Sequence, residues 1–476
     1  MNEDKAIKSA SWYVISNLIL KALSFITAPI FTHILTPAEY GGVSSFFAWK
    51  SIIAVFVGLG LDYTIGRAKI DFKDAFDKYL SSLQSLMIFA GIIIFCVISF
   101  IAKKCFGFFM DYSIYLIFLM VLYAISQSII SLFQSKLRFE YKYWGNIFIA
   151  FFTVLSSTGL SLFFIFFLMK TDKSLGRIFG IVFPSIFLSL FCFLSLLGKG
   201  KKLVDLTIWK YALIFSLPMI PHGLSMIILE QMDRLMIVKY VGMEEAGLYS
   251  YAYTFATILG LFVNSLMNGW QPWFFENFDK GNKDKINNSV DMLLFLLLVF
   301  LTVFVCCIPE LMMLMGREEF WSAKYVAIPV IVGCFFQFLY TVFVQIELYN
   351  KKTFIISIGS ISAALCNLIL NYIFIPKYGY VAAGYTTLIS YFMLMIYHFF
   401  ICKVVFRTKI FSLITVAKYS CFILFIAIIY ALLYRLSFFY KYIFCFLLII
   451  LELLVYKNHL SMIIKLAKNK FKFSSI

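Results

Sequence analysis

The sequence predicts an all-α polytopic membrane protein with about fourteen transmembrane helices, and three observations lead to this fold class. The 476-residue chain is 62% hydrophobic and only 14% charged, whereas soluble domains are about 45 to 50% apolar. Apolar runs of about 20 residues recur along its whole length, and each matches the roughly 30 Å of hydrocarbon that a helix must cross. Most of the 41 Lys and Arg residues lie between those runs.

The apolar runs place the helices, and the turns between them carry Gly, Pro and charged residues. The start of the chain has no small-residue cleavage site after a short apolar core, so we treat it as the first mature helix. The expected helices are residues 12–33, 43–66, 80–102, 113–135, 145–169, 177–197, 211–236, 247–272, 288–308, 324–347, 353–375, 380–402, 413–434 and 440–456.

The cationic residues are distributed unequally between the two sides of the predicted membrane. Of the 41, 26 fall on the side of the N-terminus and four lie well within helices, and the other 11, which include Arg177, Lys324 and Lys441 at helix ends, fall on the opposite side. Under the positive-inside rule this excess predicts that both termini are cytoplasmic. The formal charge of +17 is therefore an orientation signal and an attraction to anionic membrane lipids, and no nucleic-acid partner is expected.

A repeat offset by 206 residues runs through the chain. The first helix is expected to end near Pro37 and the Gly41, Gly42 pair, with Glu39 beginning the next helix. The segment 34–49 aligns with 240–255, pairing Glu39 with Glu245, Gly41 with Gly247, Ser44 with Ser250 and Trp49 with Phe255. A period that contains six helices gives both halves the same orientation, as in transporters built from parallel repeats.

The repeat predicts two six-helix lobes, residues 1–206 and 207–412. Helices thirteen and fourteen and a basic cytoplasmic tail occupy 413–476. No extramembrane segment exceeds about 20 residues, and the phosphate loop GxxxxGK[ST] is absent, so neither an enzyme nor a cofactor is expected. The ten cysteines lie mostly within apolar runs and favour neither a disulfide framework nor a metal site.

Ionisable residues inside the predicted helices are the first candidates for function. Each costs roughly 2.5 to 3.5 kcal/mol at the bilayer centre unless it faces a partner or water. Lys21 lies near the middle of the first helix. Lys50 lies nearer the external end of the second, where its side chain can snorkel to the interface. For both residues a purely structural pairing remains the alternative.

Helix seven carries Glu230, Asp233 and Arg234 in its second half, after Pro218 and Pro221, which should kink it. Glu230 and Arg234 are four apart and share a face. One interpretation is a closed ion pair that lets the helix insert. The other is a charged cavity wall, in which Glu230 or Asp233 exchanges a proton and Arg234 binds phosphate through its planar fork.

Polar residues elsewhere leave similar alternatives open. Asn268 and Gln271, near the end of helix eight, can meet sugar hydroxyls or act as polar contacts between helices. His222 is more typical of a packed residue than of a proton relay. Asp62, near the inner end of helix two, is interpreted as a water-facing cap.

Three stretches, 28–46, 231–256 and 367–391, resemble the signature segments of bacterial polysaccharide flippases, the O-antigen and capsule transporters of the Wzx type. That family belongs to an exporter superfamily that includes multidrug antiporters and lipid II flippases. The resemblance implies a V-shaped bundle of two lobes in the bacterial inner membrane. It also implies alternating access that moves an undecaprenyl-pyrophosphate-linked oligosaccharide from the cytoplasmic to the external leaflet.

The resemblance further implies that cations in a central cavity receive the pyrophosphate, for which Lys21, Lys50 and Arg234 are the candidates by position. A polysaccharide polymerase and a chain-length regulator are the implied protein partners. One alternative is a multidrug or cation antiporter of the same superfamily, which would need a net acidic, aromatic cavity. Another is a membrane O-antigen polymerase, which would be expected to have a large external loop, whereas the longest external segment, about 309–323, is short.

Overall fold

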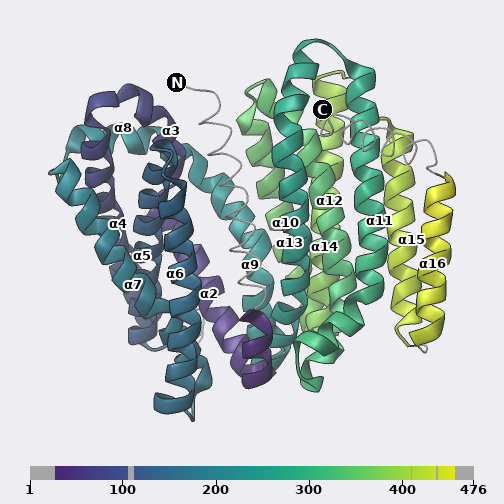
Figure 1. The fold of residues 1–476 in the computed structure, drawn as a ribbon, viewed down its shortest axis with the longest axis horizontal. Coiled ribbons are helices and arrows are strands. Elements are labelled where there is room, and N and C mark those ends of the chain that lie inside the picture. The colour runs from purple at the N-terminus through teal and green to yellow at the C-terminus, as the bar shows by residue number, and fades with distance from the viewer. Residues whose placement is uncertain (1–26, 105–111, 409, 436–437, 456–476) are drawn as a thin grey trace, which may run out of the picture. The chain divides into compact units, whose positions relative to one another are not determined.

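The computed structural model describes residues 27–104, 112–408, 410–435 and 438–455. Helices make up the secondary structure of these residues (Figure 1). The α-helices are α2 (Pro37–Gly58), α3 (Asp62–Asp71), α4 (Phe76–Lys104), α5 (Ile114–Phe139), α6 (Tyr143–Phe163), α7 (Lys173–Gly200), α8 (Leu206–Ser216), α9 (Ile220–Tyr240), α10 (Met243–Asp279), α11 (Lys283–Met315), α12 (Lys324–Tyr349), α13 (Thr353–Tyr378), α14 (Tyr380–Phe400), α15 (Leu413–Leu433) and α16 (Phe438–Val455). Short 3₁₀ segments cover Lys73–Ala75, Leu217–Met219 and Glu318–Ala323, and π-helical turns cover Phe164–Leu168 and Ile401–Val405.

Twelve helical stretches among the described residues are long and apolar enough to cross a membrane. They correspond in order to the second through thirteenth predicted helices, and α16 coincides with the fourteenth. The prediction of an all-α polytopic membrane protein is therefore confirmed. Most of the first predicted helix, with Lys21, lies outside the described residues, and residues 27–34 form its helical end.

The chain divides into two compact units, which we describe separately. Unit 1 contains the described residues up to Ser250 together with Ser360–Ala383, and unit 2 contains Tyr251–Gly359 and the described residues from Gly384 onward. In unit 1, α4, α5, α6 and α7 run side by side (Figure 1). Phe46, Val57, Ala124 and Val182 belong to its largest core cluster, which joins α2, α5 and α7.

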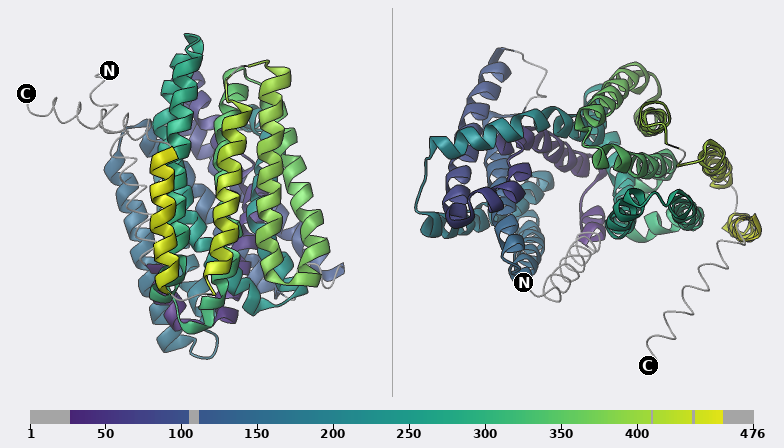
Figure 2. Two further views of the ribbon diagram at one scale, coloured as in Figure 1. Left: turned by 90° about the vertical axis from the view of Figure 1, so that its right-hand side faces the viewer. Right: turned by 90° about the horizontal axis from the view of Figure 1, so that it is seen from above.

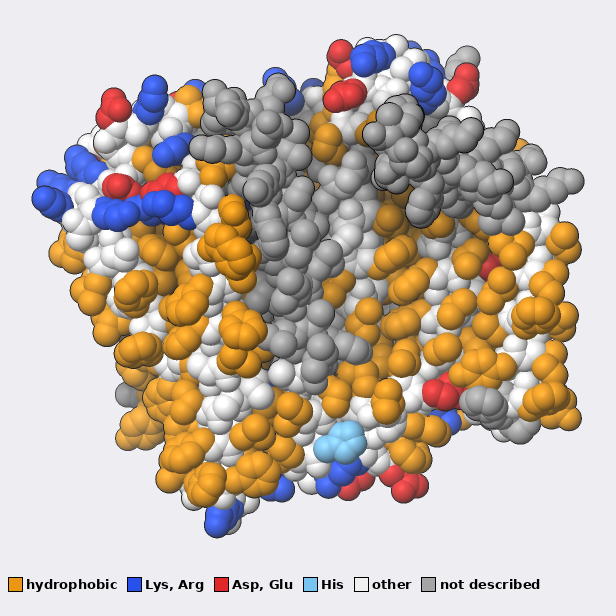
Figure 3. Space-filling view, in the orientation of Figure 1, with side chains coloured by type: hydrophobic (Ala, Val, Ile, Leu, Met, Phe, Trp, Pro, Cys, Tyr) orange, Lys and Arg blue, Asp and Glu red, His pale blue; other side chains and the backbone are white. Residues whose placement is uncertain are grey.

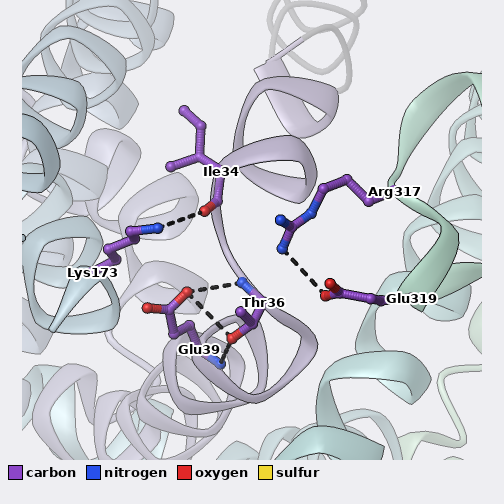
Figure 4. Close-up of polar contacts among 6 residues, drawn as sticks. All are labelled: Ile34, Thr36, Glu39, Lys173, Arg317 and Glu319. Atoms are coloured by element: carbon purple, nitrogen blue, oxygen red, sulfur yellow. Dashed lines mark hydrogen bonds and ion pairs between the residues drawn. The ribbon is translucent and has the colours of Figure 1, made fainter. Parts of the chain in front are cut away.

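The start of α2 is fixed by a capping box (Figure 4). The backbone N–H of Glu39 donates to Thr36 Oγ1 at 3.2 Å, and the backbone N–H of Thr36 donates to Glu39 Oε2 at 2.8 Å. Pro37 occupies the first turn, where its missing N–H costs nothing. Beside this cap, Lys173 Nζ donates to the carbonyl oxygen of Ile34 at 3.3 Å. These contacts begin the helix at residue 37, two residues before Glu39, which was expected to begin it, and six before the predicted membrane span 43–66.

Gly41 and Gly42 lie inside α2, so the prediction that this pair breaks the chain is wrong. Gly41 is used instead for close packing. A Cβ on Gly41 would lie 1.8 Å from the carbonyl oxygen of Met243, and a Cβ on Gly247 would lie 1.9 Å from that of Pro37. Small residues allow helix backbones to approach closely in membrane proteins.

The same helix crossing pairs residues that are equivalent under the predicted repeat. Gly41 faces Gly247, and the hydroxyls of Ser44 and Ser250 are 2.9 Å apart. Both pairs are separated by 206 positions. Residues that the sequence repeat pairs therefore meet at one helix crossing within unit 1, while the division into two six-helix lobes stays a prediction.

In unit 2, α11 packs against α12, α15 and α16, and α15 lies beside α16 (Figure 2). Two charged contacts hold α16 on α11. Lys441 Nζ lies 2.5 Å from Glu310 Oε1, and Thr302 Oγ1 donates to Glu452 Oε1 at 2.5 Å. Each pairs an ionisable residue of an apolar helix with a partner on its neighbour, which offsets the cost of burying it.

The surface of unit 1 has an apolar belt with charged ends (Figure 3). Hydrophobic side chains cover the sides of its helices, and Lys and Arg gather at the end where α3 and α8 lie. At that end Asp205 caps α8 by accepting from the N–H of Thr207 and of Ile208. The hydrogen bond from Lys78, 2.8 Å away, lowers the pKa of the Asp205 carboxyl below its ordinary value.

Candidate functional site

Two membrane-spanning helices of unit 1 are interrupted where they contact one another. Between α2 and α3, Gly60 has a φ of +65°, a left-handed conformation that glycine adopts without strain. Between α8 and α9, the 3₁₀ turn Leu217–Met219 contains Pro218, which cannot donate to an α-helical ladder. A Cβ on Gly60 would lie 3.3 Å from the carbonyl oxygen of Ser216. The two interruptions are therefore packed together.

A cavity of about 530 Å³ opens beside these interruptions. Its volume falls in the range of ligand pockets, about 300 to 1,000 Å³. The polar side chains that line it come from α2, α3, α5 and α9 and are Ser51, Asp62, Tyr63, Gln127, Ser128, Ser131, His222 and Glu230. A polar wall within membrane-spanning helices needs water or a polar ligand to satisfy it, so we take this cavity as the candidate functional site.

Two carboxylates give the cavity wall its charge. Asp62, in the first turn of α3, accepts a hydrogen bond from Ser131 Oγ, which lies 3.3 and 3.4 Å from its two oxygens. The carboxylate of half-buried Glu230 forms no hydrogen bond or ion pair within the described part of the chain. No Lys or Arg is among the described residues that line the cavity. The described part of the wall therefore carries two acidic side chains.

Two further polar groups of the cavity wall are held by hydrogen bonds to residues outside it. His222 Nδ1 lies 2.9 Å from Ser360 Oγ, and Gln127 Nε2 donates to Ser185 Oγ at 3.1 Å. Sequence reasoning interpreted His222 as a packed residue and Asp62 as a cap, and it missed their common cavity. The signal that would have found it is their proximity to helix-breaking Gly and Pro residues.

Arg234 lies one turn beyond Glu230 on α9, and its guanidinium follows the helix. Nη1 donates to the carbonyl oxygen of Glu230 at 2.6 Å and to Gln231 Oε1 at 3.1 Å. The guanidinium carbon lies 5.9 Å from the centre of the Tyr249 ring. Within the described residues, the side chains of Glu230 and Arg234 do not form an ion pair, although the positive charge of Arg234 acts on the carboxylate, which lines the cavity.

Asp233 belongs to a buried hydrogen-bond network and does not line the cavity. Its Oδ2 accepts from the Tyr249 hydroxyl, and its Oδ1 accepts from Asn371 Nδ2 at 2.6 Å. The same Asn371 amide lies 3.0 Å from Asn367 Oδ1. This network ties α9 to α10 and α13 in unit 1. Of the three charged residues predicted on helix seven, only Glu230 faces the cavity.

Neither candidate lysine is among the described residues that line the cavity. Lys50 lies about 20 Å from the start of α2, because an α-helix rises 1.5 Å per residue. Its Nζ lies 4.8 Å from the centre of the Tyr123 ring. Its neighbour Ser51 lines the cavity, but Lys50 itself is not among the lining residues. Lys21 lies outside the described residues.

Asn268 and Gln271 lie on the part of α10 that belongs to unit 2. Gln271 Nε2 donates to Gln345 Oε1 at 2.8 Å, and Gln345 Nε2 donates to the carbonyl oxygen of Thr341 at 3.0 Å. Asn268 is exposed, as is Asn264 one turn earlier. α10 therefore presents exposed amides in a span of low hydropathy, beside a hydrogen bond between two helices.

Secondary transporters build their binding sites from interrupted membrane helices around a polar cavity. The described residues of unit 1 show the same arrangement. Solved structures share the fold. The lipid II flippase MurJ, in an inward closed conformation, aligns with a TM-score of 0.70 and 18% identity over 94% of this chain and 99% of that chain. An inward-facing multidrug resistance transporter of the MATE family aligns with a TM-score of 0.60 and 16% identity over 83% and 99%. A MOP superfamily transporter from Pyrococcus furiosus gives a TM-score of 0.55 and 16% identity over 83% and 94%.

The sequence identifies the family. The profile of the family described as polysaccharide biosynthesis protein matches residues 6–278, which is more than half of the chain. The protein belongs to this family. A relative from Haemophilus influenzae, described as an uncharacterized membrane protein, is 25% identical over 367 residues, 75% of this chain and 88% of that protein.

Proposed function

We propose that this protein is a flippase for a lipid-linked oligosaccharide. It moves an undecaprenyl-pyrophosphate-linked O-antigen or capsule repeat unit from the cytoplasmic to the external leaflet of the bacterial inner membrane. Membership of the polysaccharide biosynthesis family and the fold shared with the lipid II flippase support this proposal. Both termini are cytoplasmic in the proposed orientation.

The observation that carries the proposal is the polar cavity beside two interrupted helices. Each unpaired polar group costs several kcal/mol in hydrocarbon, so sugars and pyrophosphate do not cross the bilayer unaided. A polar cavity replaces part of their hydration. Alternate opening of the two lobes, proposed as residues 1–206 and 207–412 with 413–476 appended, then exposes the head group to each side while the polyprenyl tail stays in lipid.

The cationic candidates fit the pyrophosphate part of this cargo. Arg234, one turn from the cavity residue Glu230, is proposed as its main partner because a guanidinium donates two parallel hydrogen bonds to phosphate. Lys50 and Lys21 are proposed to add positive charge, and Asn268 and Gln271 to contact sugar hydroxyls. Glu230 and Asp233 remain the candidates for ion coupling. A polysaccharide polymerase and a chain-length regulator are the proposed partners downstream.

The experiment is depletion of the protein in its host, followed by analysis of lipid-linked sugars. We expect undecaprenyl-pyrophosphate-linked repeat units to accumulate on the inner leaflet while the surface polysaccharide falls, and wild-type protein supplied in trans should reverse both changes. Unchanged lipid-linked sugars together with unchanged surface polysaccharide would refute the proposal.

A second candidate, a multidrug or cation antiporter, is favoured by one observation: the described cavity wall carries Asp62 and Glu230 and no cation. Organic cations suit an acidic wall. Proteoliposomes loaded with a cationic dye separate the two functions. Dye efflux that requires Glu230 or Asp233, in a protein that moves no lipid-linked sugar, would assign the antiporter function instead.

A further inference from the structure

The cavity of unit 1 holds acceptor groups that its own protein partners do not use. Glu230 has no hydrogen-bond partner within the described residues, and Asp62 has the hydroxyl of Ser131. A carboxylate offers about four acceptor sites. Most of this capacity therefore faces the cavity, where a ligand rich in O–H or N–H groups can fill it.

Among the described lining residues, Asp62 and Glu230 are the acidic side chains, and Arg138 and Arg234 act on them electrostatically from outside the lining. The guanidinium of Arg234 bonds the backbone of α9 and Gln231, and the ammonium of Lys50 lies over the Tyr123 ring. Both cations flank the cavity without belonging to the lining residues. Juxtaposition of like charges suppresses wrong partners, so a ligand that brings its own carboxylate into this wall is disfavoured.

The remaining wall resembles a sugar-binding surface more than a site for an organic cation alone. The hydroxyls of Ser51 and Ser128 can both donate and accept, and His222 presents an imidazole. Sugar hydroxyls have the same double capacity. A quaternary cation would leave these donors unused, at the cost of burying them unpaired.

From this geometry we propose that the cavity of unit 1 binds the sugar portion of the cargo and selects neutral or amino sugars over sugars that carry a carboxylate. The proposal rests on the flippase function proposed above and adds the class of sugar to it. The carboxylates of Glu230 and Asp62 accept hydrogen bonds from hydroxyl or ammonium groups and repel uronic acids. The pyrophosphate lies toward Arg234 and Lys50, outside the acidic wall.

The test uses full-length protein in nanodiscs and three probes that share a farnesyl diphosphate carrier. They differ only in the attached sugar, which is N-acetylglucosamine, glucosamine or glucuronic acid. The dissociation constant of each is measured from intrinsic tryptophan fluorescence. We expect the first two to bind at least about tenfold more tightly than the third. Equal binding of all three, or tighter binding of the glucuronic acid probe, would overturn the proposal.

Substitutions of the two carboxylates test whether they cause the preference among the sugar probes. Glu230→Gln combined with Asp62→Asn removes both charges at almost constant shape and should reduce the preference to less than about threefold, mainly through tighter binding of the acidic probe. Glu244→Gln, an equivalent change at an exposed position on α10, should leave the preference intact. A preference that persists in the double variant would contradict the assignment.

Controls for folding keep the result interpretable. Each variant is compared with the wild type by thermal unfolding and by size-exclusion profile, and Glu230→Gln alone replaces the double variant if the latter does not fold. Failure of all three diphosphate probes to bind well-folded wild-type protein would refute the flippase function itself. Binding of all three without preference would refute only the class of sugar.

Discussion

Gly41 and Gly247 contact each other although 206 positions separate them in the chain. The repeat in the sequence predicted that the two residues are equivalent, whereas the local sequence predicted a helix break at Pro37 and the Gly41, Gly42 pair. Glycine favours turns and also allows close approach of backbones, and the local sequence does not distinguish the two roles. The partner, Gly247 on another helix, decides between them.

We predict that Gly41→Ala and Gly247→Ala each lower the stability of the protein by roughly 1 to 3 kcal/mol or more, because each new Cβ would overlap a backbone oxygen that cannot rotate away. The apparent melting temperature of purified protein in detergent measures the effect. Gly269→Ala on α10 is the matched control, since a Cβ at this position would have no atom within 4 Å, and it should be neutral or slightly stabilising. Equal melting temperatures for all three variants would contradict this packing.

The charged residues of α9 illustrate what a sequence can and cannot predict about a site. Spacing placed Glu230 and Arg234 on one face, and the cost of buried charge marked them as candidates. Spacing did not show that Glu230 faces a cavity while Asp233 is held by Asn371. That distinction depends on a residue 138 positions away, and a single sequence does not reveal such a contact.

We predict that Arg234→Ala reduces export of the lipid-linked glycan by at least about tenfold, a loss equivalent to about 1.4 kcal/mol, while membrane insertion and abundance stay unchanged. Arg234→Lys should recover only part of the activity, because lysine keeps the charge but loses the planar fork. Lys239→Ala removes a cation from an exposed position on the same helix and should have little effect. Surface polysaccharide measured at matched protein levels is the readout, and a normal level in Arg234→Ala would remove Arg234 from the site.

Lys21→Ala should weaken export in the same assay.

Among the elements, the existence of the helices was easier to predict than their interruptions. Pro218 and Pro221 predicted a kink in helix seven, because proline cannot continue the ladder, and the structure has a 3₁₀ turn there, between α8 and α9. The break between α2 and α3 was missed, and residues 43–66 were expected to form one helix. Gly58, Leu59 and Gly60 lie inside an apolar run, and hydropathy responds to composition and not to a positive φ.

Helices α12 and α14 of unit 2 are joined by a buried contact between a histidine and a glutamate. His398 Nδ1 lies 2.6 Å from Glu347 Oε1, and both side chains are 0% exposed. The second oxygen of Glu347 and Nε2 of His398 have no hydrogen-bond partner in the described structure. Such a pair is destabilising when broken but contributes little relative to apolar side chains of similar size.

We therefore predict that Glu347→Leu or His398→Leu alone lowers the stability by about 3 to 5 kcal/mol, since each leaves an uncompensated polar group in the core. Joint replacement, Glu347→Leu with His398→Leu, should recover most of that loss. Thermal unfolding of the wild type, the two single variants and the joint variant forms a double-mutant cycle. Strictly additive effects of the two single replacements would show that the pair is not coupled.

For the whole molecule, the parallel halves stay a prediction, whereas hydropathy and the length of the apolar runs were sufficient to predict a helical membrane protein. They were sufficient because membrane-spanning segments must satisfy their backbone internally and have a fixed minimum length. The orientation of the chain depends on a weaker signal, the 26 to 11 distribution of its 41 cations, and it stays a prediction.

We predict that Lys202→Cys, between α7 and α8, reacts with a membrane-impermeant maleimide only after the cytoplasmic side is opened. Thr171→Cys, between α6 and α7, should react in intact spheroplasts. The native cysteines are replaced beforehand, and both introduced positions are exposed. The opposite labelling pattern would invert the proposed orientation and with it the direction of transport.

The central claim is that the cavity beside the interrupted helices of unit 1 receives the polar head group of a lipid-linked glycan. Photocrosslinking tests it most directly, with an undecaprenyl-pyrophosphate-linked sugar that carries a diazirine on the sugar and with mass-spectrometric mapping of the labelled peptides. The account predicts label within residues 51–63, 127–131 and 219–230, and less label when unmodified lipid-linked sugar competes. Label that competes equally well but lies only outside these segments would contradict it.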